Sequence, residues 1–262
     1  MDEFVEHYMS QGVDHFYIVN NNSNDAVHEW LEQSKYKDFI TLRNDTRDMG
    51  FFLSNEGPAG HKQLLDENFY DLVRCETEWV LVVDTDEFMF GKNGYTLRTY
   101  LSTLDDAIGC VYVLWNIITP NCVNGKIPDA FSIKTNTKRL DYDILRDLSP
   151  NIQHANDFGK SLVRTSMLDD FRKFWLHKIF VNGKTITNYG NEKNEWYDNM
   201  NTIDYSEEKY AKLNITLHHY AIRNHADFVK KSKQLDQVPQ KRKFILGLFE
   251  MLELDDSHFK GT

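Results

Sequence analysis

The chain has 262 residues, 41% of them hydrophobic, which is enough apolar material for the core of one large α/β domain. Its formal net charge is −10 and no stretch is rich in lysine and arginine, which argues against nucleic-acid binding through the phosphate backbone. No apolar run approaches the roughly 18 residues of a membrane-spanning helix, and the N-terminus lacks a signal-peptide segment. These features predict a cytoplasmic protein without a membrane span.

Helical and extended periodicities alternate along the first third of the chain. We predict helices over residues 2–11, 25–36 and 61–76, and strands over 15–19, 38–42 and 79–83. A polar turn of asparagine and aspartate follows the first strand. This order predicts a mostly parallel central sheet flanked by helices, in which ligands bind at the carboxyl ends of the strands.

The remainder of the chain is less regular until its C-terminal end. We predict strands over residues 110–115, 161–164, 174–180 and 213–220, a hairpin joining 178–181 to 184–187, and helices over 97–104, 224–235 and 240–252. Residues 120–158 and 188–205 are polar and aperiodic, and long segments of this kind are usually functional or mobile. Because no repeat or linker interrupts the chain, we expect a single domain over residues 1–262.

The run Trp79–Phe90 carries the strongest chemical signal. Five apolar residues end abruptly at Asp84 and Asp86, whose side chains point the same way on an extended backbone. Two carboxylates at the end of a buried strand repel each other unless a cation lies between them, and Mg²⁺ and Mn²⁺ are bound in this way. The alternative is a strand end with solvated acids, which the apolar residues 88–90 make less favourable.

Several segments together resemble the family 2-like and family 92-like glycosyltransferases. Trp79–Phe90 is similar to their "WVLFIDVDEFLF" segment, and His15–Asp25 to "GVDHFYIYDNNSTD". Weaker similarities follow in the same order at Lys160–Arg164 ("KSIVRP"), His219-Tyr220 ("HY") and a helix with Lys230 and Lys231 ("EEF…K"). Together they span about residues 3–235, which is most of the chain.

The resemblance implies a GT-A fold with C-terminal helices, and transfer of a sugar from a nucleotide-sugar, expected to be a UDP-sugar, to a glycan or other hydroxyl acceptor. It also implies Mn²⁺ or Mg²⁺ on the D-x-D carboxylates and an inverting reaction. The chain departs from the family at its start, because it begins inside what corresponds to the first helix. The opening strand of the fold, which helps to bind the base, is therefore expected to be missing.

Three residues are expected to hold the metal. Asp86 is the predicted direct ligand, and Asp84 is predicted to contact either the ribose or the metal. His219 aligns with the family "HY" element and is predicted as the third ligand, since imidazole binds Mn²⁺ well. His218 and His219 point to opposite faces of a strand, so only one of them can face the site. The alternative is one satisfied core histidine and one exposed histidine.

The resemblance places nucleotide contacts at Asn20, Asn22 and Asp25. The alternative is ordinary turn chemistry, with Asp25 capping the next helix. Lys160 and Arg223 are candidate phosphate partners, whose default role is a solvated surface charge.

Two further residues complete the predicted site. Trp115 ends a strand and could stack on a sugar, although a core aromatic is an equally good interpretation. An inverting transferase needs a carboxylate to deprotonate the acceptor hydroxyl. The sequence offers several candidates, and Asp157, shortly before Lys160, is the predicted base among Asp143, Asp147, Asp157, Asp169 and Asp198.

Two other classes of protein stay open. A haloacid dehalogenase-type phosphatase also has an apolar strand that ends in D-x-D, with the first aspartate as nucleophile. Its motif lies at the first strand, whereas here the motif follows the third and continues into Glu87 and Phe88. A non-catalytic nucleotide- or carbohydrate-binding module of the same fold is the other alternative.

Overall fold

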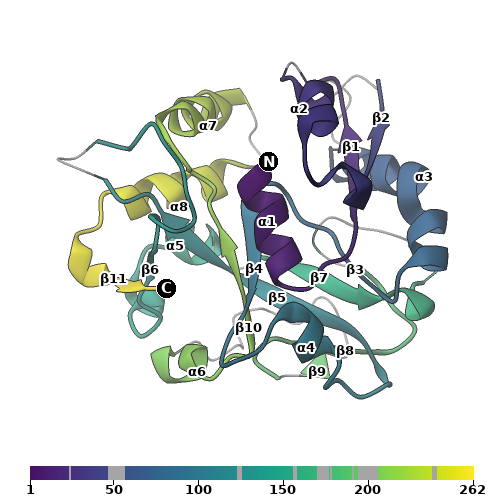
Figure 1. Cartoon of the computed structure of the whole chain (residues 1–262). Coiled ribbons are helices and arrows are strands. Elements are labelled where there is room, and N and C mark those ends of the chain that lie inside the picture. Colours follow the sequence, from purple (N-terminus) through teal and green to yellow (C-terminus); the bar gives the residue numbers. More distant parts are fainter. Residues whose placement is uncertain are drawn as a thin grey trace.

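The computed structural model describes residues 1–23, 25–46, 57–122, 126–155, 158–169, 177, 179–190, 192–193, 206–237 and 241–262. Within them, nine strands form one curled main sheet and two more form a small separate sheet (Figure 1). The main sheet comprises β3 (Trp79–Leu81), β4 (Glu87–Gly91), β5 (Ile108–Thr119), β6 (Lys138–Leu140), β7 (Gly159–Arg164), β8 (Lys184–Thr187), β9 (Glu192–Lys193), β10 (Ile215–His219) and β11 (Phe259–Gly261).

The long strand β5 is the centre of the main sheet. Its sequence is almost wholly apolar and rich in β-branched and aromatic residues, and every residue after Ile108 is buried. The first half of β5 pairs with β7 and β8, and the second half with β6 and β10. Strands that are far apart in the sequence therefore meet along β5.

The prediction of a mostly parallel GT-A sheet is wrong. Of the eight strand pairings in the described part of the main sheet, only β5–β8 and β5–β10 are parallel. The strand before the acids, β3, pairs antiparallel with the much later β7, and not with β1 or β2. Local periodicity identifies a strand but does not identify its partner, and the connection rules favour pairing with a sequence neighbour, which β3 does not do.

The beginning of the chain does contain the predicted β-α-β unit. β1 (Phe16–Asn20) and β2 (Ile40–Asn44) pair in parallel, with α2 (Val27–Gln33) between them in sequence. Tyr17 and Val19 of β1 pack against α3 (Gly57–Glu76). This small sheet with α2 and α3 lies to the right in Figure 1 and carries the predicted nucleotide-binding turn.

One helix packs on strand β4 of the main sheet, and three other helices pack against one another. α1 (Asp2–Ser10) packs on β4, where His7 Nε2 lies 2.7 Å from the Met89 carbonyl oxygen and the Tyr8 hydroxyl donates to the Glu87 carbonyl oxygen. α8 (Arg242–Leu252) packs against α5 (Pro150–Ala155) and α7 (His225–Gln237), to the left in Figure 1. The other helices are α4 (Leu97–Leu101), α6 (Glu207–Ala211) and the short η1 (Lys37–Phe39), η3 (Leu145–Asp147), η4 (Thr165–Met167) and η7 (Asp256–His258).

Several smaller predictions can be compared directly. The helices predicted near residues 97–104, 224–235 and 240–252 are confirmed within a few residues as α4, α7 and α8. The hairpin into residues 184–187 is wrong, because β8 pairs with β5 and β9. None of the described helices is long and apolar enough to span a membrane.

A buried ion pair ties β6 to α6. Arg139 Nη1 and Nη2 lie 2.7 and 2.5 Å from the two carboxylate oxygens of Glu207, and its guanidinium stacks 3.7 Å from the Tyr210 ring centroid. The Arg139 side chain is only 5% exposed. Burial raises the pKa of Glu207. The hydrogen bonds from Arg139 and from the Tyr142 amide lower it by more than burial raises it, so the pKa lies below its usual value.

Glu207→Gln is expected to lower the free energy of unfolding by about 2–3 kcal/mol at pH 7, because Arg139 keeps its charge and loses its partner. The native pKa of Glu207 is depressed, so this stability is present at neutral pH and is lost as the pH falls through that value. Urea unfolding at pH 7 and pH 3.5 measures both effects. Glu208→Gln is the control, because its pair with Lys212 is exposed; an equal loss in both variants would contradict the prediction.

Candidate active site

The three acids lie in a tight turn that joins β3 to β4. The Glu87 amide donates to the Asp84 carbonyl oxygen (3.0 Å), and the Asp84 amide donates to the Glu87 carboxylate (2.9 Å). Directly after β10, the Tyr220 amide donates to the Asp86 carbonyl oxygen (2.8 Å). The backbone of the turn is therefore fixed from both sides, while the Asp84 and Asp86 side chains remain 58% and 23% exposed.

A fully buried lysine lies beneath this turn. Lys160 Nζ, on β7, is 2.9 Å from Asp84 Oδ2 and 3.2 Å from Glu87 Oε2, and neither Lys160 nor Glu87 has exposed side-chain surface. Burial lowers the pKa of Lys160, but the two carboxylates more than offset this and raise it. For Asp84, burial acts to raise the pKa, but the charge of Lys160 outweighs this effect and brings the pKa below its usual value. For Glu87, burial dominates and raises the pKa.

His219 faces the second aspartate of the motif. In the register of β10 and β4, His219 lies opposite Glu87 and His218 opposite Phe88, so the two imidazoles are on opposite faces of the sheet. His219 Nε2 is 3.7 Å from Asp86 Oδ2. His218 instead lies against the Phe90 ring (4.6 Å between centroids). The geometry thus brings His219, and not His218, to the acids.

The electrostatic environment favours an ionised Asp86. Burial raises the pKa of this carboxyl, but the adjacent His219 imidazole and the positive charges of Lys231 and Arg223 outweigh it and hold the pKa well below its usual range. Arg223 follows β10 and forms a two-pronged pair with Asp227, with Nε 2.7 Å from Oδ2. Asp86 is therefore a negative charge within a mainly positive environment.

Aromatic rings form the floor beneath His219. Its ring centroid is 4.3 Å from that of Trp115, and Phe244 of α8 stacks on it at 5.9 Å with an interplanar angle of 14°. Trp115 is 5% exposed, so it is a core aromatic below the histidine and not an open platform for a sugar. His177 lies against the same Trp115 ring, and burial lowers its pKa to about 4, so it is neutral at pH 7.

Two buried polar atoms in this floor lack partners. Trp115 Nε1 and His219 Nδ1 make no hydrogen bond to the described residues. Because buried polar groups are normally satisfied, these atoms mark the floor as a place where water or a ligand belongs.

The turn after β1 makes the hydrogen bonds expected of ordinary turn chemistry, and its predicted nucleotide contacts stay a prediction. The Asn20 amide group donates to Asn44 Oδ1 (3.0 Å) and the Asn22 amide group to the Thr46 carbonyl oxygen (3.2 Å), while Asn22 adopts a positive φ of 53°. Asp25 is exposed and does not cap α2, whose N-cap is Ala26 with no side-chain cap. In the described residues this turn belongs to the small sheet, which has no strand pairing with the main sheet. Turn chemistry therefore accounts for Asn20 and Asn22.

The predicted phosphate contact of Lys160 is not favoured by this geometry. Its ammonium group is shielded from solvent by the protein and already contacts two carboxylates, so it can act on a ligand only by holding Asp84. The resemblance of the Lys160–Arg164 strand predicts Lys160 as a phosphate partner, whereas the β3–β7 pairing places it under the acids. Asp157, the predicted base, lies outside the described residues.

The predicted set of three metal ligands is not assembled. Among the described residues, no group of three His, Cys, Asp or Glu side chains is arranged to hold a metal ion. Asp84 is tied to Lys160, which leaves Asp86 and His219 as a pair of donors close enough to contact one cation. Mg²⁺ commonly binds one or two carboxylates and takes its remaining ligands from water and substrate phosphates. The pair suits a cation that is shared with a phosphorylated ligand.

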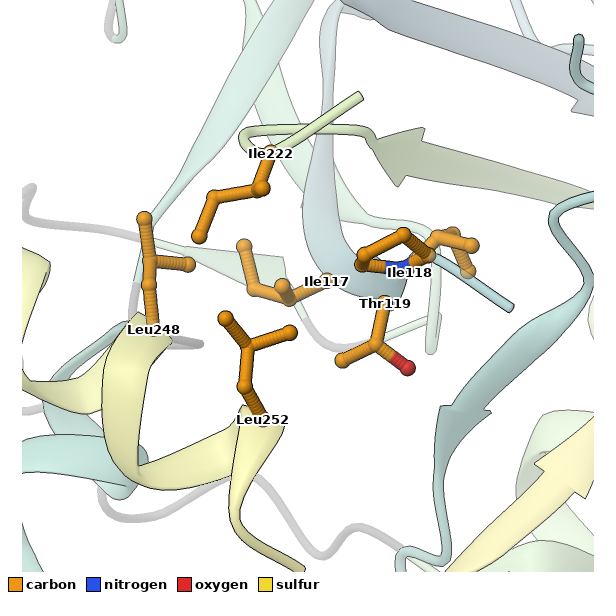
Figure 2. A pocket seen from close by; sticks show the side chains of 7 residues that line it. Ile117, Ile118, Thr119, Ile222, Leu248 and Leu252 are labelled. Carbon is orange, nitrogen blue, oxygen red and sulfur yellow. The ribbon is translucent and has the colours of Figure 1, made fainter. Parts of the chain in front are cut away.

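A small pocket nearby does not suit such a ligand. Leu248 and Leu252 of α8 point toward Ile117 of β5, next to Ile222 (Figure 2). Thr119 supplies the single polar side chain of this lining, so the pocket offers almost nothing to a charged group.

No protein-family model matches the chain, and no curated protein is similar to it.

A close backbone approach positions Lys160. A Cβ atom at Gly159 would lie 2.2 Å from the Val113 carbonyl oxygen on β5, so only glycine fits there. Gly159→Ala is therefore expected to push β7 from β5 and to lower the free energy of unfolding by about 1–3 kcal/mol, a typical cost of overpacking. Urea unfolding measures this. Gly261→Ala, where nothing lies within 4 Å, is the control, and equal stability of the two variants would refute the argument.

Proposed function

We propose that this chain is a glycosyltransferase, which moves a sugar from a nucleotide-diphosphate sugar to a hydroxyl acceptor. The observation that carries the proposal is the pair of Asp86 and His219, 3.7 Å apart, at a fixed turn whose electrostatics favour an ionised carboxylate. Two protein donors are too few for a resident metal cage and suit a divalent cation that is shared with a diphosphate. The ordered resemblance of the segments around residues 15–25, 79–90 and 219–220 to glycosyltransferases supports the same reaction.

In the proposed reaction, the acceptor oxygen forms a bond to the anomeric carbon while the bond from that carbon to the diphosphate oxygen breaks. The electron pair leaves with the nucleoside diphosphate, and the hydroxyl proton passes to a carboxylate base, for which Asp157 stays the prediction. When bound by Asp86 and His219, a divalent cation supplies positive charge for the departing diphosphate. Lys160 holds Asp84 in place, and the backbone amide of Tyr220, just after β10, holds the backbone of Asp86.

Metal removal tests this function. With Mn²⁺ present, we expect the protein to hydrolyse at least one member of a panel of UDP- and GDP-sugars slowly without an acceptor, measured as release of the nucleoside diphosphate by chromatography. EDTA is expected to stop the release, and added Mn²⁺ to restore it, because two protein donors cannot retain the cation against a chelator. Phosphate release from a phosphomonoester with Mg²⁺ present, without nucleoside diphosphate release from any nucleotide-sugar, would instead support a phosphatase.

A further inference from the structure

Lys231 is a cation near the candidate site that the reaction described above does not use. It is half-buried on α7, and its Nζ lies 5.7 Å from the centroid of the Phe244 ring. That ring stacks on His219, which in turn faces Asp86. The ammonium group is thus two side chains away from the acidic turn, on the side formed by the C-terminal helices.

The charge of Lys231 has no partner of its own among the described residues. Asp227, one helical turn earlier on the same face of α7, is already paired with Arg223. No described carboxylate lies within ion-pair distance of Lys231, and its described contact is the aromatic face of Phe244. A half-buried ammonium group has lost part of its favourable interaction with water. Hydrogen bonds to an anionic ligand can compensate for this loss.

The electrostatics of the site agree with this geometry. Burial lowers the pKa of Lys231, whereas the Asp86 carboxylate acts to raise it. In return the charge of Lys231 contributes to the low pKa of Asp86, after burial and after His219. The charges of Lys231 and Asp86 therefore attract each other across the His219 and Phe244 rings.

We infer that Lys231 binds the diphosphate of the donor together with the Asp86–His219 pair, so that the diphosphate reaches from the turn at β3–β4 past the rings of His219 and Phe244 to a lysine on α7. The inference rests on the proposed function. It assigns to α7 a direct part in the site, and it makes the diphosphate, rather than the base or the sugar, the group that Lys231 recognises. An ammonium is well suited to this because it contacts phosphate oxygens as a compact point charge.

The test is the affinity of Lys231→Met for UDP, inorganic pyrophosphate and uridine, measured by titration calorimetry with Mn²⁺ present. UDP and pyrophosphate are expected to bind about 10- to 100-fold more weakly than to the unmodified protein, the range for one hydrogen bond to a charged group. Any uridine affinity should stay the same, because uridine has no phosphate. Lys231→Arg is expected to recover part of the loss.

Lys233→Met is the matched control, because Lys233 is exposed on the same helix and its removal changes the net charge equally. Unchanged UDP and pyrophosphate affinity in Lys231→Met, with tight binding by the unmodified protein, would overturn the inference and leave the proposed function intact. Equal losses in Lys231→Met and Lys233→Met would also overturn it, since they indicate only a general charge effect. If the unmodified protein binds neither ligand with Mn²⁺, the proposed function fails as well.

Discussion

Asp86→Asn is expected to reduce Mn²⁺-dependent hydrolysis of a nucleotide-sugar about 100-fold or more, while the protein stays folded. Asparagine has the size of aspartate but lacks the negative charge that the surrounding His219, Lys231 and Arg223 favour. Removal of one preorganised group that stabilises the charge of a transition state typically costs 10²–10³-fold in rate. The measurement is the turnover rate at saturating donor, together with the Mn²⁺ concentration that gives half of it.

The fold should tolerate this change because the Asp86 side chain reaches solvent and its backbone contact with Tyr220 does not involve the carboxylate. Asp71→Asn, an exposed acid on α3, is the matched control and is expected to keep full activity. A rate in Asp86→Asn within threefold of the unmodified protein would remove Asp86 from the metal site and, with it, the main support for the proposed function.

Sequence patterns predicted the position of the acidic turn but not the strand that follows it. Asp84 and Asp86 do follow a strand, as predicted from the apolar run before them, although β3 ends at Leu81 and leaves Val82 and Val83 outside it. β4 was missed because Glu87, which looks like a solvated turn acid, begins the strand and is fully buried. A carboxylate becomes a core residue here because Lys160 provides a cation, and no local pattern shows that pairing.

The histidine pair was interpreted correctly at the level of geometry. Alternation along a strand requires His218 and His219 to face opposite sides, and the structure places His219 beside Asp86. The overall sheet was predicted wrongly because strand partners are set by contacts between distant segments. Leu81 pairs with Leu162 and Trp115 with Leu217, and no local sequence pattern indicates either pairing.

Lys231 shows a related limit of prediction. In the sequence it is one of several lysines in a helix, and helical periodicity cannot tell which of them meets another element. Its significance depends on Phe244, which α8 brings between α7 and β10. A contact between a lysine of one helix and a ring of another becomes visible only when helix packing is known.

Lys160→Met is expected to lower the free energy of unfolding by about 3–5 kcal/mol at pH 7, the usual cost of removing one partner of a buried ion pair. Methionine fills a similar volume, so the loss arises from the uncompensated carboxylates of Asp84 and Glu87. Since Glu87 can take up a proton, the deficit is expected to be smaller at pH 5 than at pH 8. Urea unfolding measures it, with Lys243→Met, an exposed lysine on α8, as the control.

Adding Glu87→Gln to Lys160→Met is expected to recover a large part of the lost stability, because the double variant no longer buries a carboxylate without its cation. The glutamine side chain introduced at position 87 keeps an oxygen that can accept from the Asp84 backbone amide, so the turn itself is retained. Strict additivity of the two single changes would show that Lys160 and Glu87 are energetically independent despite their 3.2 Å separation. Recovery of stability without recovery of hydrolysis would separate two roles of Lys160: compensation of Glu87 within the core, and fixation of Asp84 at the site.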